Sequence, residues 1–541
     1  MSAIHTLNPK AEHARRGQAL EINIGAAEAI AQILSPNFGP NGLLKLLVGG
    51  AGDLRISKDG AVLLEELPIA HPSAALISRT ATAMDDVCGD GTTSCVLLIG
   101  ELLRQARRWL QEGVHPRVIT EGYEKAKECA LAHLNAVKRA SDGSFGQLLQ
   151  AANTVLCTKI KPKLASQLAE ICVNAVLTAN KCAEDKKLID LHMIEIMTMQ
   201  HQSDMDSCFI NGIVCDHGWR YDELKCSEFK NCHVLTLNVT LEYEKTEVNS
   251  QYYYKNSAER VAQADEEREY IDIRVRQIIE LCKQVRKEGQ SFVVLNMKGV
   301  DQISLQMFAE HNIMALRRVK RRNLERLTLA CGGNCLNTLD NLSEADLGFA
   351  GKVYEKQLGE EKFTFVEEVK IQKSCTILLR GPNKHTVLQL KDAVRDGLRA
   401  VKNHMVDMEY VGGAGAFEVS LYNRLNEFAN TVTGKPRLGV LAYADAILQI
   451  PKTLAKNAGF DPQDAVLKVV DAQKAGQLVG LDIKTGDVID IFEAGIIDQY
   501  RVKYQLIHSA TTISCQMLLV DEILRAGRAM SGGAEQEQDV E

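Results

Sequence analysis

The chain has 541 residues, of which 45% are hydrophobic and 25% are charged. This length exceeds what one hydrophobic core usually supports, so we expect about two to four domains. The formal net charge of -7 argues against bulk nucleic-acid binding as the main activity. No apolar run reaches the roughly 18 residues that a membrane helix needs, and residues 1–10 lack the apolar core of a signal peptide. We therefore expect a cytoplasmic protein with no membrane partner.

The 15 cysteines are an odd number and are scattered without a Cys-x-x-Cys pair. This distribution suits neither a disulfide framework nor a zinc ribbon, so we predict reduced thiols that are mostly buried. Cys208, Cys215 and His217 form the nearest approach to a metal cluster. Because a second pair of ligands is missing, we interpret these three as packing residues.

The first 180 residues are predicted to be almost wholly helical. Residues 11–33 have the apolar spacing of an amphipathic helix that ends at Ser35-Pro36. Further helical stretches are expected at 74–84, 94–112, 116–138 and 144–180. Glycine-rich loops at 39–42 and 57–60 border two short stretches, 43–48 and 54–57, of which the second has strand character, and each loop alone would be interpreted as a plain turn.

The segment 89–94, Gly-Asp-Gly-Thr-Thr-Ser, leads directly into an apolar helical run. Glycines let the backbone approach a ligand closely, and the free N–H groups at a helix start favour phosphate. Asp90 would repel phosphate unless a divalent cation such as Mg2+ bridges the two. The segment therefore predicts phosphate and metal together, although the same residue types also form ordinary capping turns. The Gly-x-x-x-x-Gly-Lys-Ser/Thr sequence of a P-loop does not occur.

The middle of the chain has the short, bounded apolar runs that are typical of strands. Strands are expected at 193–199, 209–214, 233–237, 292–296, 363–366 and 375–381, and a helix at 303–311. Residues 242–280 are strongly charged, include Tyr252, Tyr253 and Tyr254, and suggest an extension that projects from a domain. The basic run 317–322 is interpreted as a solvated helix face, and net acidity disfavours the alternative of nucleic-acid binding.

Helices are expected again from His385 to about Val406, and from the glycine-rich loop 412–416 to Asn457. Residues 513–526 are predicted to form a last apolar helix, and the polar tail 532–541 is expected to be disordered. The order helical, strand-rich, helical suggests one domain built from both chain ends, with another inserted in the middle.

With its loops taken together, the sequence resembles the group II chaperonins, a family that includes the subunits of the eukaryotic cytosolic chaperonin. The match runs from about Leu7 to Ala529, and four segments in this order carry it: 39–42, 57–60, 89–94 and 413–418. The resemblance implies an α+β multidomain chaperonin fold. It would have a mainly helical equatorial domain (1–145 and 406–541), a small mixed intermediate domain (146–213 and 374–405) and an α/β apical domain (214–373) with a helical protrusion at about 242–280.

The resemblance also implies an activity, cofactors and partners. The chain would be an ATP-dependent chaperone subunit in which ATP binding and hydrolysis, with ATP and Mg2+ as cofactors, drive closure of a built-in lid. Its partners would be related subunits in a hetero-oligomeric double ring and non-native client proteins such as actin and tubulin, with no specific nucleic acid. The basic run 317–322 would face the chamber or the apical groove, where it could meet acidic clients.

Individual residues receive roles from the same resemblance. Asp90 would hold Mg2+, Asp59 and Asp396 would orient the attacking water, and Lys159 would approach the phosphates. Without the resemblance, Asp396 would be interpreted as a helix-surface acid flanked by arginines. The residues implied in nucleotide binding are Gly39, Pro40, Gly42, Asp59, Gly60, Gly91, Thr92, Thr93, Ser94 and Lys159, with Gly413, Gly415 and Glu493 bordering the ribose and adenine.

Four positions depart from the family pattern and bear on the hydrolysis rate. Ser57 replaces a usual threonine, Asn41 a common lysine, Ala414 a glycine and Gln499 a frequent proline. Two alternatives follow: an ATP-binding structural subunit with little hydrolysis, and a free-standing nucleotide-dependent binding protein. The second conflicts with the large apolar faces that the terminal helical segments would leave uncovered without neighbours.

Overall fold

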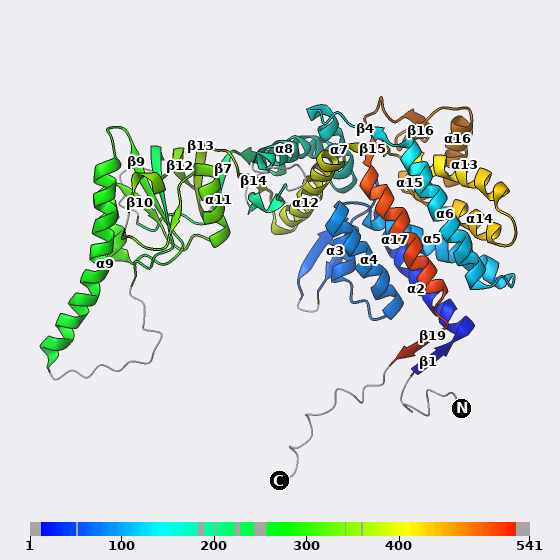
Figure 1. Cartoon of the computed structure of the whole chain (residues 1–541), viewed down its shortest axis with the longest axis horizontal. Helices are drawn as coiled ribbons and strands as arrows, with labels where there is room; N and C mark the ends of the chain where they lie inside the picture. The colour runs from blue at the N-terminus through cyan, green and yellow to red at the C-terminus, as the bar shows by residue number, and fades with distance from the viewer. Residues whose placement is uncertain are drawn as a thin grey trace, which may run out of the picture. The chain divides into compact units, whose positions relative to one another are not determined.

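The computed structural model describes residues 12–49, 52–181, 189–200, 203–221, 228–242, 256–340, 342–358 and 361–525. The chain divides into two compact units, shown in Figure 1. The terminal unit comprises Met1–Ala169 and Asp392–Glu541, and the central unit comprises Glu170–Lys391. The terminal unit thus combines both chain ends, the discontinuous form that the order of predicted elements suggests. The finer division into three domains stays a prediction.

The terminal unit is organised around helix α5 (Thr92–Gln111). Residues 95–103 of this helix are buried without interruption, so this stretch is enclosed around its whole circumference and needs neighbours on every side. Gly100 lets one neighbour come close, because a Cβ there would lie 2.6 Å from Cβ of Ala31. The helices that contact it include α2 (Arg16–Leu34), α4 (Pro72–Cys88), α6 (Pro116–Val137), α14 (Pro436–Ile447), α15 (Gln449–Ala458) and α17 (Tyr500–Leu518). Helix α13 (Ala416–Thr431) packs on α14 and α6.

Shorter elements of this unit carry its loops. Helix α3 (Gly60–Glu66) follows the antiparallel hairpin of β2 (Lys45–Val48) and β3 (Leu54–Ser57), and helix α7 (Phe145–Lys159) and helix α16 (Pro462–Lys474) complete the helical set. Three small sheets join β18 (Ile497–Gln499) to β15 (Glu409–Gly412) and β4 (Arg139–Ala140), β16 (Val479–Leu481) to β17 (Val488–Asp490), and β1 (Glu12–Arg15) to β19 (Glu522–Arg525).

The central unit is built on a seven-stranded sheet with helices on both faces. Alternate residues of one strand serve the two faces, since Val293 and Leu295 pack in one core cluster while Phe292 and Val294 pack in another. The strand order is β10 (Ile313–Leu316), β9 (Ser291–Asn296), β8 (Glu228–Leu237), β12 (Gly348–Leu358), β13 (Glu361–Val369) and β7 (Gly212–Cys215), with β11 (Cys335–Leu336) paired to β8.

Helices α9 (Ser257–Val285) and α10 (Gln302–Glu310) cover one face of this sheet, and α11 (Arg321–Cys331) covers the other. A three-stranded sheet orders β5 (Ile194–Met199), β14 (Cys375–Arg380) and β6 (Cys208–Ile210). Helices α8 (Pro162–Asn180) and α12 (Lys384–Asp407) each extend across a unit boundary in the sequence. Residues 243–255, with Tyr252, Tyr253 and Tyr254, and the tail 532–541 lie outside the described residues.

Most predicted elements are confirmed, and two expectations change. The last helix is wrong beyond Leu518, because α17 ends there and residues 522–525 form β19, which pairs with β1. The continuous helix over 144–180 is interrupted before α8, where Pro162 cannot donate an intrahelical hydrogen bond. Neither α3 nor β12 was predicted.

The thiol and charge predictions can also be checked. Each described cysteine is a free thiol and most are buried, as predicted. His217 Nε2–H donates to Arg317 O (2.8 Å), which fits its interpretation as a packing residue. The helix-face interpretation of 317–322 holds only from Arg321 onward, since residues 317–320 precede α11. Among the described helices, none is both long and apolar enough to cross a bilayer.

Candidate functional site

A cavity in the terminal unit is formed by the predicted loops and the helix starts beside them. Its empty volume is about 1340 Å³, counting the space at its open mouth. Its walls include Gly39, Pro40, Lys58, Asp59, Gly60, Asp90, Gly91, Thr92, Thr93, Ser94, Lys159, Ala414, Gly415, Ile450, Leu454, Leu481, Asp482, Asp498 and Lys503.

The turn before α5 has the geometry of an anion-binding loop. Gly91 caps the helix in the left-handed region (φ 88°), and a Cβ there would lie 2.6 Å from Cε of Met84. A side chain at Gly60 is excluded as well, because its Cβ would lie 2.6 Å from Oγ1 of Thr93. No side chain caps the first turn of α5, so the ordinary capping-turn alternative lacks its hydrogen bond. The first N–H groups of the helix therefore remain available to a ligand in the cavity.

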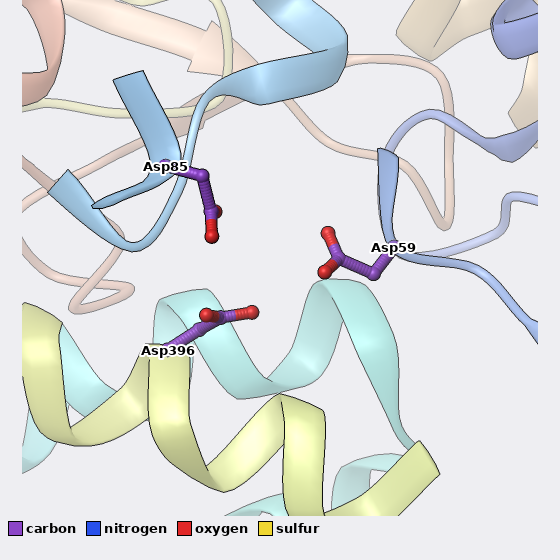
Figure 2. Close-up of side chains that lie close together, drawn as sticks. All are labelled: Asp59, Asp85 and Asp396. Carbon is purple, nitrogen blue, oxygen red and sulfur yellow. The ribbon is translucent and has the colours of Figure 1, made fainter. Parts of the chain in front are cut away.

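Three carboxylates from separate segments converge beside this loop, as Figure 2 shows. Oxygen atoms of Asp59, Asp85 and Asp396 lie within 4.8 Å of one another. The Lys159 ammonium, at the end of α7, lies 3.3 Å from Asp59 Oδ1 and is also paired with Asp396 Oδ2. The Arg399 guanidinium donates to Asp85 Oδ2 at 2.9 Å. We call these three aspartates, Lys159 and Arg399 the acid cluster.

Local structure explains why each carboxylate is directed inward. Asp59 is the N-cap of α3 but makes no capping hydrogen bond with its side chain. Its own N–H donates to Ser57 Oγ (3.1 Å), a role that the substitution of threonine by serine preserves. Helix α12 approaches because residue 89 has no side chain: a Cβ on Gly89 would lie 2.6 Å from Arg399 Cβ. Asp396 is consequently only 3% exposed, and its interpretation as a surface acid is wrong.

Burial dominates the electrostatics of the cluster. It raises the pKa of Asp85 to about 6 against the opposing charges of Lys159 and Arg399. Burial also raises the pKa of Asp396 well above its usual range, with Lys159 opposing and Asp59 adding to the shift. Although burial lowers the pKa of the Lys159 ammonium, the surrounding carboxylates, first that of Asp396, raise it well above its usual value. The lysine therefore stays charged among more carboxylates than it can balance.

Asp90 adds a further acid at the cavity wall. Its Oδ1 accepts from the N–H of Gly91 at 2.7 Å. Its enclosure raises the pKa of the carboxyl, the charge of Lys159 lowers it, and the charge of Asp498 raises it. A hard divalent cation would offset this surplus of negative charge, and carboxylate oxygens are the ligands that Mg2+ prefers. The residues present thus fit Mg2+.

Lys58 precedes Asp59 in the chain and is only 8% exposed. Its ammonium donates to Pro40 O at 2.9 Å, and burial lowers its pKa to about 8. This lysine offers a positive charge beside the 39–42 loop, where Asn41 replaces the lysine common in the family. Lys58 lies within the segment 57–60, but no role was predicted for it from the sequence.

The loop 413–415 contributes another part of the cavity wall. Ala414 adopts a left-handed backbone (φ 52°) that glycine would adopt more readily, and its carbonyl accepts from Leu481 N at 3.0 Å. Gly415 is also left-handed (φ 77°) and caps α13. On the same side Lys503 Nζ lies 2.6 Å from Glu418 Oε1 and 2.8 Å from Asp498 Oδ2.

The structure brings most of the predicted site residues to this cavity. Asp396 does not line it but contacts Lys159, which does, whereas Gly42, Gly413 and the exposed Glu493 are not among its lining residues. Sequence reasoning assigned no role to five charged residues here: Lys58, Asp85, Asp482, Asp498 and Lys503. Of these, Lys58 lies inside the segment 57–60 and could have been proposed from it, whereas Asp85 has no distinguishing pattern.

Comparisons with known proteins agree with this geometry. Residues 30–528 match the TCP-1/cpn60 chaperonin family. The chain is 50% identical over 529 residues to "T-complex protein 1 subunit zeta-2" of Homo sapiens and 49% identical to the Mus musculus protein of the same name, covering 97% of this chain and 99% of each relative. The chain therefore belongs to the TCP-1/cpn60 chaperonin family, and it is an ATP-dependent chaperone subunit.

The match also supports a finer resemblance in the sequence. The segments 241–250, 380–386 and 391–403 resemble the zeta subunit of the eukaryotic cytosolic chaperonin, and both relatives carry that subunit's name. Residues 243–250 of the first segment lie outside the described part of the structure.

Proposed function

We propose that this chain binds ATP with Mg2+ in the cavity and hydrolyses the ATP. The observation that carries the proposal is the meeting, in one cavity, of the Gly91 loop at the start of α5 with Lys159 and its carboxylates. Phosphoryl transfer needs positioning and charge neutralisation more than covalent chemistry, and this arrangement can supply both. Apolar side chains of Ile450 and Leu454 on the wall suit the flat face of a base.

The residues divide the task among themselves. Thr92, Thr93 and Ser94 bind phosphate through the first N–H groups of α5 and their hydroxyl groups, and Asp90 holds Mg2+, which neutralises phosphate charge. Asp59 and Asp396 orient the attacking water, and Lys159 stabilises the transferring phosphate. The remaining contacts of the nucleotide are Gly39, Pro40, Gly60 and Gly91, with Gly415 toward the ribose and adenine. The family also implies Gly42, Gly413 and Glu493, which do not line the cavity in this structure.

The β2–β3 hairpin supports assembly with other subunits. Leu43, Leu46, Val48 and Leu54 are 68%, 59%, 67% and 48% exposed, although apolar side chains of this size normally gain by burial. The two strands pair only with each other in the described part of the chain. An isolated two-stranded hairpin is marginally stable, and its open edges invite pairing with another chain. The proposed occupants are related subunits of a hetero-oligomeric double ring.

The domain roles follow from the family. Residues 1–145 and 406–541 form the equatorial domain, 146–213 and 374–405 the intermediate domain, and 214–373 the apical domain with α9 in its protrusion. The ring acts in the cytoplasm on non-native proteins, with actin and tubulin as expected clients, and nucleotide cycling closes the lid. The basic run 317–322 meets acidic clients, although Arg318, Lys320 and Arg321 already pair with Glu242, Asp216 and Glu325.

Photo-crosslinking with an azido-ATP tests the nucleotide site in the assembled ring, because label can be quantified on this chain alone. We expect saturable, Mg2+-dependent label on the unmodified chain and a large loss of that dependence in Asp90→Ala. Asp464→Ala, an exposed acid at the start of α16 that does not line the cavity, is the matched control. Label that neither saturates nor responds to Mg2+ or to Asp90→Ala would contradict the proposal. Label without hydrolysis would favour the structural-subunit alternative.

A further inference from the structure

A second charged group lies in the same cavity, away from the acid cluster. The Lys503 ammonium, in the first turn of α17, bridges the Glu418 carboxylate (2.6 Å) and the Asp498 carboxylate (2.8 Å). Burial alone would lower the pKa of Lys503, but the charges of Asp498 and Glu418 raise it well above its usual range. The ammonium therefore stays charged throughout the physiological pH range.

The three members differ in how they meet the cavity. Lys503 and Asp498 line it, and the Asp498 side chain is 24% exposed. Glu418 is 2% exposed and does not line the cavity, so it lies behind Lys503. A bound ligand can meet Lys503 and Asp498 directly, whereas Glu418 can influence it only through Lys503.

The position of Glu418 is poorly explained by stability alone. Its Oε2 is buried and has no hydrogen-bond partner among the described residues. A buried carboxylate with one satisfied oxygen contributes little to stability and is often outperformed by an apolar residue of similar size. Glu418 is the third residue of α13, which begins directly after the left-handed Gly415 of the cavity wall. A fixed acid at this place holds a lysine steady at the wall.

We propose that Glu418 is a positioning residue for the nucleotide, which acts through Lys503 to hold the Lys503 ammonium and the Asp498 carboxylate in place on the cavity wall. The inference rests on the proposed function. Without the charge of Glu418, Lys503 keeps one acidic partner and is free to turn toward Asp498 or the cavity. The polar atoms that meet the nucleotide then lose their fixed positions, and the ordering cost of binding increases.

The expected effect is on affinity and not on the chemical step. Lys503 bonds with Glu418 and Asp498, whereas the carboxylates assigned to the attacking water, Asp59 and Asp396, bond with Lys159. Changing Glu418 therefore leaves the water-orienting pair in place. A general loss of folding would instead lower both affinity and turnover.

The test uses assembled rings that carry Glu418→Gln in this chain only. Gln keeps the size of the side chain and an oxygen for Lys503 but removes the charge. We expect the azido-ATP concentration for half-maximal label on this chain to increase about tenfold, as the loss of a charge-assisted hydrogen bond commonly costs. We expect single-turnover hydrolysis by this chain, at saturating ATP, to change less than about twofold. Glu101→Gln, a buried glutamate on α5 that does not line the cavity, is the matched control.

Lys503→Met is a second variant that tests whether Glu418 acts through Lys503. It also serves if Glu418→Gln does not assemble. It is expected to weaken labelling at least as much as Glu418→Gln, and adding Glu418→Gln to it should cause no further weakening. Independent, multiplying effects of the two substitutions, or an unchanged half-saturation in Glu418→Gln, would overturn the inference while leaving ATP binding intact. Absence of label on the unmodified chain would overturn the proposed nucleotide site itself, and this inference with it.

Discussion

The cavity contains two lysines that are each paired with two carboxylates, and the two groups differ in size and in the segments that form them. Lys159 has Asp59 and Asp396 as direct partners, and Asp85 belongs to the same cluster. Lys503 lies between Glu418 and Asp498. In the acid cluster burial raises the pKa of Asp85 to about 6 and that of Asp396 well above its usual range.

The origin of the members differs as well. The acid cluster joins four helices, α3, α4, α7 and α12, whereas the Lys503 group joins the start of α13 to the adjacent β18 and α17. A cluster of three carboxylates on four separate helices is suited to accept a cation and to change during a reaction cycle. A smaller ion triplet on two parts of the chain is suited to hold a fixed wall. The same residue types thus serve two tasks, and the number of charged groups and of segments involved distinguishes them.

The largest expected effect is on hydrolysis, and it comes from removing the carboxylate that α12 contributes to the acid cluster. Asp396→Asn in this chain should lower its single-turnover ATP hydrolysis in the assembled ring by about 100-fold or more, the usual range for losing a group that assists proton transfer. Azido-ATP labelling should persist. Asp392→Asn, one turn earlier on the same helix and paired with Arg55, is the control and should hydrolyse at the normal rate. Equal rates in the two variants would refute the role of Asp396.

The next effect is on stability and tests the charge surplus directly. Lys159→Met leaves buried carboxylates without their shared cation, so the free energy of unfolding should fall by about 3–5 kcal/mol at neutral pH. The deficit should shrink as pH falls, because protonation removes the uncompensated charges. Urea unfolding followed by Trp109 fluorescence in a Trp219→Phe background reports on the terminal unit.

Lys125→Met is the matched control for that measurement. Lys125 pairs with Glu121 on the exposed surface of α6, with 41% of its side chain exposed, so its loss should cost less than about 0.5 kcal/mol. A Lys159→Met protein as stable as this control would mean that the cluster carries no surplus charge.

A third effect, on the pH dependence of ATP affinity, distinguishes Lys58 from the acid cluster and from the Lys503 group. Its pKa of about 8, against 10.5 for a free lysine, means that its charge is lost as pH rises through 8. ATP affinity should therefore fall above pH 8, by at most about tenfold per pH unit, and Lys58→Met should remove that part of the decline. Folding has the opposite sign: the unfolded lysine binds its proton up to about pH 10.5, so stability increases with pH between 8 and 10.5. If azido-ATP labelling of the unmodified chain and of Lys58→Met falls to the same extent between pH 7 and pH 9, Lys58 does not cause the decline.

The sequence predicts the parts of this cavity that depend on local chemistry. Glycines at 89 and 91 and the apolar run behind them identify the loop and α5, because left-handed turns and helix starts have local signatures. The residues implied by the family motifs remain predictions in their detailed roles, although most of them meet at one cavity. The burial of Asp396 could not be read from its neighbours, since it depends on the approach of α12 to Gly89, more than 300 residues away in the sequence.

The error at the end of the chain has the same physical origin. Apolar residues continue past Leu518 with helical spacing, which favours a longer helix. The segment Glu522–Arg525 instead pairs with Glu12–Arg15, and hydrogen bonds to the far end of the chain outweigh a local preference. Lys503 was missed for a related reason: a lysine in the first turn of a helix has no pattern of its own until Glu418 and Asp498 surround it.

The smallest expected effect compares the buried and the exposed ion pair of Arg399. Its guanidinium reaches the buried Asp85 at 2.9 Å and, on the other side, Asp86 at 3.6 Å, whose side chain is 80% exposed. Arg399→Met should cost about 1–3 kcal/mol because it removes a cation from the acid cluster, whereas Asp86→Asn should change the free energy of unfolding by less than about 0.5 kcal/mol. Both are measured by the Trp109 urea transition. Equal losses of unfolding free energy in the two variants would show that Arg399 stabilises the protein through its exposed pair with Asp86. The buried pair with Asp85 would then contribute no more than the exposed one.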